Sequence, residues 1–92
     1  MNKDDVHQTH PAIIKRLKRA AGHLSSIITM LETERSCLEL AQQLHAVESA
    51  IANAKKTLIH DHIDHCLDES VRSDGAASRK SLEEFKEITK YL

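Results

Sequence analysis

The chain has 92 residues, of which 40% are hydrophobic and 29% charged, and its formal net charge is -1 at pH 7. This length makes one small domain, and one tyrosine, one phenylalanine and no tryptophan leave a monomer with a thin core, so we expect it to oligomerise. No apolar run is long enough to cross a membrane and the N-terminus is polar, so we expect a cytoplasmic protein. In that reducing compartment two cysteines favour metal ligands or reactive thiols over a disulfide.

Hydrophobic periodicity predicts an all-α fold of three helices in a single domain over residues 11–92, after a flexible arm over residues 1–10. Pro11 suits a first helical turn, and the first helix is predicted to end at about residue 32 or 33. Its apolar residues recur at steps of three and four, at Ile14, Leu17, Ala21, Leu24, Ile28 and Leu31. Gly22 interrupts this helix, which we interpret as a place where another backbone packs closely.

The longest stretch without Gly or Pro is residues 36–67, predicted to be one long central helix. Ser36 and Glu39 form a capping-box pair, which makes Cys37 the first helical residue. An apolar seam follows, typical of a helix that packs lengthwise against another, at Leu40, Leu44, Val47, Ile51, Ala54 and Leu58. Residues 68–79 are predicted to be a helix end and connector. Ser81 and Glu84 then repeat the capping pattern before a short third helix with Leu82, Phe85, Ile88 and Leu92.

Cys37, His62 and Cys66 are the strongest candidates for a metal site. His62 and Cys66 are four residues apart, so they share a helix face and can hold one ion together. Cys37 lies roughly 37 Å away along the same helix, so it cannot reach that ion from its own chain. If two copies pack antiparallel about a twofold axis near Ile51, Cys37 of one lies beside His62 and Cys66 of the other. The sequence therefore predicts a dimer with two shared sites.

Two thiolates and one imidazole suit Cu(I), Ni(II), Co(II) or Zn(II), and not Mg(II) or Ca(II). Three ligands give a trigonal site, which fits Cu(I). A fourth ligand from His7 or His10 on the arm, or from His65, would favour Ni(II) or Co(II). An alternative is a thiol or persulfide sensor in which Cys37 and Cys66 of two chains are bridged. A helical interaction module with incidental cysteines is a third possibility.

The chain also carries a basic cluster, formed by Lys15, Arg16, Lys18 and Arg19 of the first helix with Lys55 and Lys56 of the second. Repeated across a symmetric oligomer, such a cluster can bind the phosphates of double-stranded DNA. The chain has no helix-turn-helix signature, no nucleophile-and-base motif and no Gly-rich phosphate loop. We therefore do not expect an enzyme.

Short motifs lie at a specific spacing over residues 12–67. They are Arg16-Leu17-Lys18-Arg19, Gly22-His23-Leu24, Cys37, Gln43-Leu44-His45-Ala46-Val47, His62 and Cys66. In these positions the chain resembles the CsoR/RcnR family of bacterial metal-sensing transcriptional repressors. The resemblance implies three-helix protomers assembled as a dimer of dimers that binds operator DNA without metal and silences a metal-efflux operon. It also implies that metal at Cys37 and the neighbouring chain's His62 and Cys66 releases the DNA.

Two positions differ from the pattern of that family. Ser36 stands where its copper sensors often carry Tyr, and Glu48 stands where several relatives carry an Arg that helps bind DNA. The first difference, with the arm that ends in His10-Pro11, favours Ni(II) or Co(II) over Cu(I). The second leaves the DNA contact to Arg16, Arg19 and the lysines.

Overall fold

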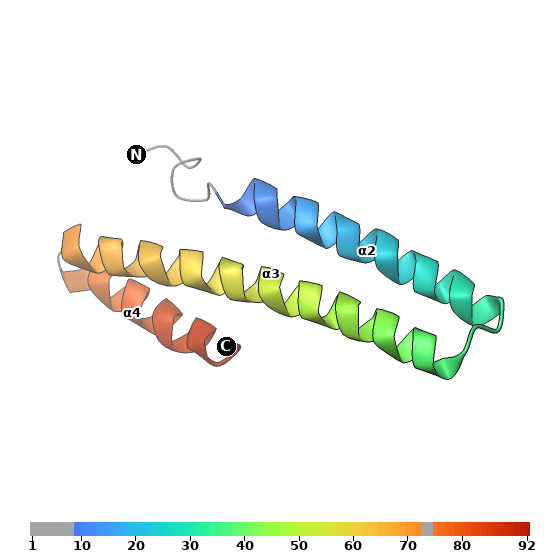
Figure 1. Ribbon diagram of the computed structural model, residues 1–92. Helices are drawn as coiled ribbons and strands as arrows, with labels where there is room; N and C mark the ends of the chain where they lie inside the picture. The colour runs from blue at the N-terminus through green and yellow to red at the C-terminus, as the bar shows by residue number, and fades with distance from the viewer. Residues whose placement is uncertain (1–8, 73–74) are drawn as a thin grey trace. The chain divides into compact units, whose positions relative to one another are not determined.

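The computed structural model describes residues 9–72 and 75–92, and the side chains at 66, 69–72, 75–78 and 81 lie outside that description. The described residues form three α-helices and no strand: α2 (His10–Glu32), α3 (Cys37–Arg72) and α4 (Gly75–Thr89) (Figure 1). The predicted all-α, three-helix fold is confirmed. None of these helices is long and apolar enough to cross a membrane. The chain divides into two compact units, Pro11–Lys55 and Met1–His10 with Lys56–Leu92.

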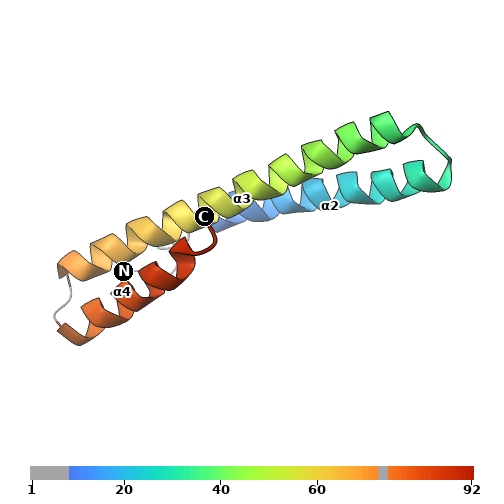
Figure 2. The same ribbon diagram turned by 90° about the horizontal axis from the view of Figure 1, so that it is seen from below.

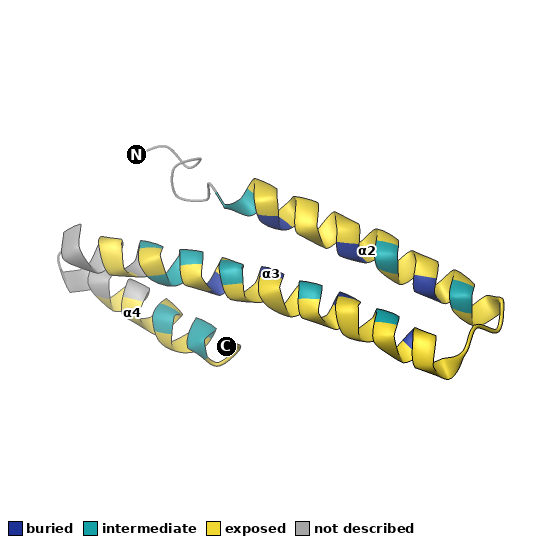
Figure 3. Ribbon diagram, in the orientation of Figure 1, coloured by how far each residue is buried: buried dark blue, intermediate teal, exposed yellow. Residues whose placement is uncertain are grey.

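In the unit Pro11–Lys55, α2 and the first part of α3 lie side by side as an antiparallel hairpin (Figures 1 and 2). The buried residues recur every seven positions on both helices (Figure 3), at Ile13, Ala20 and Ile27 on α2 and at Leu40, Val47 and Ala54 on α3. Ile27, Leu40 and Val47 form one cluster, with the partly buried Met30 packed against it. A seven-residue repeat is the spacing at which two helices pack along their length.

The turn of the hairpin is built from the end of α2. Glu34 has a φ of 57°, in the left-handed region that residues with a side chain rarely adopt. The N–H of Glu34 donates to the carbonyl of Leu31 at 3.3 Å, and the N–H of Arg35 donates to the carbonyl of Met30 at 3.1 Å. This is a Schellman motif, which satisfies carbonyls at the end of the helix. It reverses the chain without a glycine.

The start of α3 agrees with the sequence. The Ser36 hydroxyl accepts a hydrogen bond from the N–H of Glu39 at 3.2 Å, so Ser36 caps the helix. Cys37 is the first residue of α3, as predicted. The Glu39 carboxylate pairs with Arg35 at 3.1 Å on the exposed side.

The apolar seam predicted on α3 divides between two faces. Leu40, Val47 and Ala54 are buried in the hairpin, whereas Leu44, Ile51 and Leu58 are 46%, 46% and 39% exposed. On α2 the residues whose period predicted the helix are all exposed, namely Ile14, Leu17, Ala21, Leu24, Ile28 and Leu31. Each helix therefore carries one apolar row inside the hairpin and a second row that the described chain leaves uncovered.

Gly22 lies on the exposed surface of α2. A Cβ added there would meet nothing within 4 Å. The close approach of another backbone that we inferred from the sequence is therefore absent from the described part of this chain. The carbonyl of Gly22 accepts a hydrogen bond from the hydroxyl of Ser26 at 3.3 Å, within the same helix.

In the second unit, α4 lies antiparallel beside the later part of α3 (Figure 2). Ile59 of α3 is buried, and Phe85 and Ile88 of α4 are half-buried. The predicted boundaries are wrong here, because α3 continues to Arg72 and α4 already begins at Gly75. The reason is that a single Gly suits a helix start, and Ser and Ala are tolerated inside a helix whose apolar face packs on a neighbour. Residues 73 and 74 lie outside the description.

Candidate metal centre

The predicted ligands lie at two places along α3. Cys37 is the first residue of the helix, and its thiol is free and exposed. His62 lies in the second unit, and Cys66 follows it in the same helix, but the Cys66 side chain and His7 lie outside the described residues. Among the residues and side chains that the structure describes, no three His, Cys, Asp or Glu lie close enough to hold a metal ion. Within the described part of one chain, the candidate ligands therefore do not come together in one metal site.

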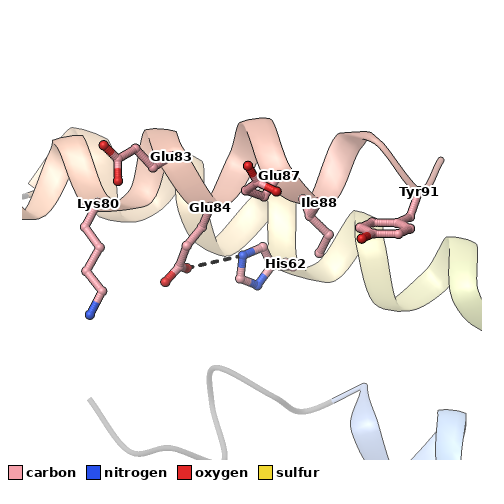
Figure 4. Close-up of a pocket in the computed structure, with 7 residues that line it drawn as sticks. All are labelled: His62, Lys80, Glu83, Glu84, Glu87, Ile88 and Tyr91. Atoms are coloured by element: carbon pink, nitrogen blue, oxygen red, sulfur yellow. Dashed lines mark ion pairs between the residues drawn. The ribbon is translucent and has the colours of Figure 1, made fainter.

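His62 is held in place by α4. Its Nε2 lies 3.4 Å from Oε2 of Glu84, and the two side chains are 28% and 50% exposed (Figure 4). A carboxylate at one ring nitrogen fixes the orientation of the imidazole and leaves Nδ1 as the nitrogen that can bind a metal. The sequence assigned Glu84 to a helix cap, which is wrong because α4 begins at Gly75. No local pattern could reveal this partner, since it depends on how α4 packs against α3.

Two cavities meet at His62. The larger, of about 580 Å³, opens between α3 and α4 and is lined by His62, Lys80, Glu83, Glu84, Glu87, Ile88 and Tyr91 (Figure 4). The smaller, of about 180 Å³, is lined by His10, Leu58, Asp61, His62, His65 and Ile88. The structure therefore brings His10 and His65, both considered as fourth ligands, to the same cavity as His62.

The other described histidines lie apart from this centre. His23 Nε2 lies 2.5 Å from Gln43 Oε1, a half-buried hydrogen bond that joins α2 to α3 inside the hairpin. His45 lies 3.9 Å from Glu48 on an exposed surface, and His60 is exposed. His23 thus stabilises the hairpin, and none of the three lines either cavity at His62.

The basic residues are all exposed, on α2 at Lys15, Arg16, Lys18 and Arg19 and on α3 at Lys55 and Lys56. Lys15, Lys18 and Arg19 line one open groove of about 490 Å³ together with Pro11 and Ile14. Exposed cationic side chains along a groove attract phosphate groups. The structure brings three of the six predicted DNA contacts together in this groove.

The family model described as "Metal-sensitive transcriptional repressor" matches residues 9–91. The chain belongs to this family. The resemblance seen in the sequence is thereby confirmed. As a metal-sensing transcriptional repressor, a member of this family is a regulator and not an enzyme.

Curated relatives of this family member carry copper in their names. The copper-sensing transcriptional repressor CsoR of Bacillus subtilis (strain 168) is 38% identical over 100 residues, covering 98% of this chain and 99% of the relative. CsoR of Mycobacterium ulcerans (strain Agy99) is 35% identical over 80 residues, covering 87% and 67%. The copper-sensing repressor RicR of Mycobacterium tuberculosis (strain ATCC 25618 / H37Rv) is 31% identical over 70 residues, covering 76% and 73%. No solved structure matches the chain.

Proposed function

We propose that this family member binds operator DNA in its metal-free form and releases it on binding Cu(I), and thereby controls metal efflux or resistance genes. The ion would be held by Cys37 of one protomer and by His62 and Cys66 of its partner. Copper is preferred over the nickel or cobalt that the sequence favoured, because the relatives reported above are all named as copper-sensing. Two soft thiolates with one imidazole also suit Cu(I).

The observation that carries this proposal is a line of exposed residues on α3. Leu44, Ile51 and Leu58 recur every seven residues and stay 39–46% exposed. Cys37 stands seven residues before this row and His65 seven residues after it, so both extend the same line. Ile51 is the midpoint, with Cys37 and His65 equally far from it. Ile51 is also the middle residue of the three regularly spaced apolar positions, so the spacing of Leu44, Ile51 and Leu58 gives the same centre.

A row of this kind is complementary to a second copy of itself. If two α3 helices pack antiparallel along it, the apolar residues become buried and Cys37 faces position 65 of the partner. Cys66 is the next residue, and His62 lies one turn earlier. Leu17 and Leu24 of α2, 43% and 41% exposed, widen the apolar face. The exposed row and the ligand spacing thus support the same dimer.

In the proposed site, α4 supplies the carboxylate that orients His62. Glu84 occupies Nε2 of His62 at 3.4 Å, so Nδ1 is the nitrogen we assign to the metal. When bound, the ion would connect a sulfur of one protomer to ligands of the other. For metal binding to release DNA, the dimer must have two arrangements, of which metal favours one and DNA favours the other.

The proposed DNA surface is the basic groove on α2 with Arg16 and the lysines of α3. In a dimer of dimers this groove is repeated four times, so double-stranded DNA would meet several cationic patches at once. Binding of this kind weakens steeply as salt rises, because it releases counterions. Since such a repressor acts where the operator DNA lies, we keep the cytoplasm as its proposed location.

A second candidate effector is Ni(II) or Co(II). The observation that favours it is the cavity shared by His10, His62 and His65, since an added nitrogen ligand suits four-coordinate nickel or cobalt. The role of His7 as a fourth metal ligand stays a prediction. The thiol-sensing alternative is not favoured, because the family and its named relatives sense metals.

The test begins with DNA selected from a random pool by the metal-free protein under anaerobic conditions. Its affinity is then measured by fluorescence anisotropy with and without Cu(I), Ni(II) or Co(II). We expect Cu(I) to weaken DNA binding by about tenfold or more, and His62→Ala to abolish this response. DNA affinity that is unchanged by all three metals contradicts the proposal. A response to Ni(II) or Co(II) that disappears in His10→Ala, with none to Cu(I), selects the second candidate.

A further inference from the structure

Two opposite charges lie beside the exposed apolar row of α3 that is centred on Ile51. Glu48 follows Leu44 of this row by four residues, and Lys55 follows Ile51 by four. Residues four apart on a helix are neighbours on its surface, so both charges lie along the same side of the row. Both residues are exposed, and both belong to the unit Pro11–Lys55.

This side of the row is the one that α2 leaves open. Val47 and Ala54, each one residue before a charge, are 4% and 2% exposed because they are buried in the hairpin. The Glu48 carboxylate lies 3.9 Å from Nδ1 of His45, and the two side chains are 81% and 77% exposed. A pair of this length in solvent is weak, so Glu48 can still pair with a charge on another chain.

The spacing of the two charges matches the antiparallel register. Glu48 lies three residues before Ile51, and Lys55 lies four residues after it. A twofold axis between two antiparallel helices keeps the same side of each helix together. With this axis at Ile51, Glu48 of one protomer lies within one residue of Lys55 of its partner, an offset of about 1.5 Å along the helix. Both side chains are long enough to close that offset.

The order of the charges also disfavours a parallel dimer. In a parallel pairing, residues of equal number lie at the same level, so Glu48 is level with Glu48 and Lys55 with Lys55. In the antiparallel pairing, each acidic side chain is level with a basic one, and the symmetry produces this contact twice. Charges beside an apolar seam set the orientation of paired helices in this way.

We propose that Glu48 of one protomer forms an ion pair with Lys55 of its partner, and that the two symmetry-related pairs set the antiparallel register of the dimer. This inference rests on the antiparallel dimer proposed above. It adds what an apolar row with a seven-residue repeat does not specify by itself, namely the orientation and register of the partner. It also assigns Lys55 to the dimer interface and leaves Lys56 as the α3 lysine of the proposed DNA surface.

Charge reversal in the full-length protein tests the pair. Glu48→Lys and Lys55→Glu each place like charges at both contacts, so we expect the dimer dissociation constant from sedimentation equilibrium to rise about tenfold or more. The double variant restores opposite charges and should return to within about threefold of the wild type. Both positions are exposed, so the variants retain the fold of the protomer, which circular dichroism checks. An equimolar mixture of the two single variants should form mainly the heterodimer in native mass spectrometry, because only there are both contacts opposite in charge.

The matched control is Lys56→Glu, the same change one residue further along α3. One residue turns the side chain by about 100° around the helix, away from the proposed contact. Lys56→Glu combined with Glu48→Lys should therefore stay about as weak as Glu48→Lys alone. Single reversals without effect, a double variant that does not recover, or an equal recovery with Lys56→Glu overturn this inference and leave the proposed function standing. A wild-type chain that stays monomeric overturns both.

Discussion

Replacing Glu84 by Gln tests whether α4 orients the His62 imidazole for metal binding. The pair is 3.4 Å long, and Glu84 is half exposed, so solvent screens it and it contributes at most about 1 kcal/mol to folding stability. Its effect on metal binding should be larger, because loss of the partner that orients a metal-binding histidine weakens affinity by about 10- to 100-fold. Glu84→Gln is therefore expected to weaken metal affinity while leaving folding stability almost unchanged.

The assay is a competition titration of the anaerobic protein against a Cu(I) chelator of known affinity, with urea unfolding of the same samples. Glu83→Gln is the matched control, because Glu83 lines the same cavity but points away from His62 (Figure 4). We expect Glu84→Gln to lose about 10- to 100-fold in affinity while its unfolding midpoint stays near that of the wild type. Wild-type affinity in Glu84→Gln, or an equal loss in Glu83→Gln, would refute the reasoning.

Three further changes test the fold and the dimer. Glu34→Gly should raise the free energy of unfolding by about 1 kcal/mol, because Gly adopts the φ of 57° without steric strain; an unchanged or lower urea midpoint contradicts this. Gly22→Ala should add about 0.5–1 kcal/mol, since the new methyl group meets nothing within 4 Å; a loss of stability would mean that another chain packs there. Ile51→Lys places two cations at the proposed twofold axis and should yield a folded monomer by sedimentation, whereas an intact dimer would move the interface elsewhere.

The helix boundaries that depend on local chemistry were predictable from the sequence. Ser36 caps α3 through the N–H of Glu39, a contact within four residues that any chain with this motif can make. The end of α2 was also predicted, although its left-handed residue is Glu34, where a Gly or Asn is the usual signal. The motif spacing over residues 12–67 sufficed to indicate the family.

Features that depend on tertiary packing were not predictable. The helix α2 has two apolar rows, and sequence periodicity followed the one at Ile14 and Leu17, whereas the hairpin buries the one at Ile13 and Ala20. Periodicity marks apolar positions but cannot tell which row faces which neighbour. The contact between His62 and Glu84 also joins residues that are far apart in the sequence. Glu84 pairs with His62, whereas its spacing from Ser81 suggested a helix cap.

The central claim is that each metal site is shared between two chains, and mixing two inactive variants tests it most directly. Cys37→Ala and Cys66→Ala homodimers each lack one ligand at both sites, but a mixed dimer has one complete site. The two variants are unfolded, combined and refolded under anaerobic conditions, and tight Cu(I) binding is measured by thiolate absorption. The account predicts that neither variant alone binds tightly and that the mixture recovers about a quarter of the wild-type capacity. A mixture that binds no more than its separate components, or a Cys37→Ala protein with wild-type affinity, would contradict it.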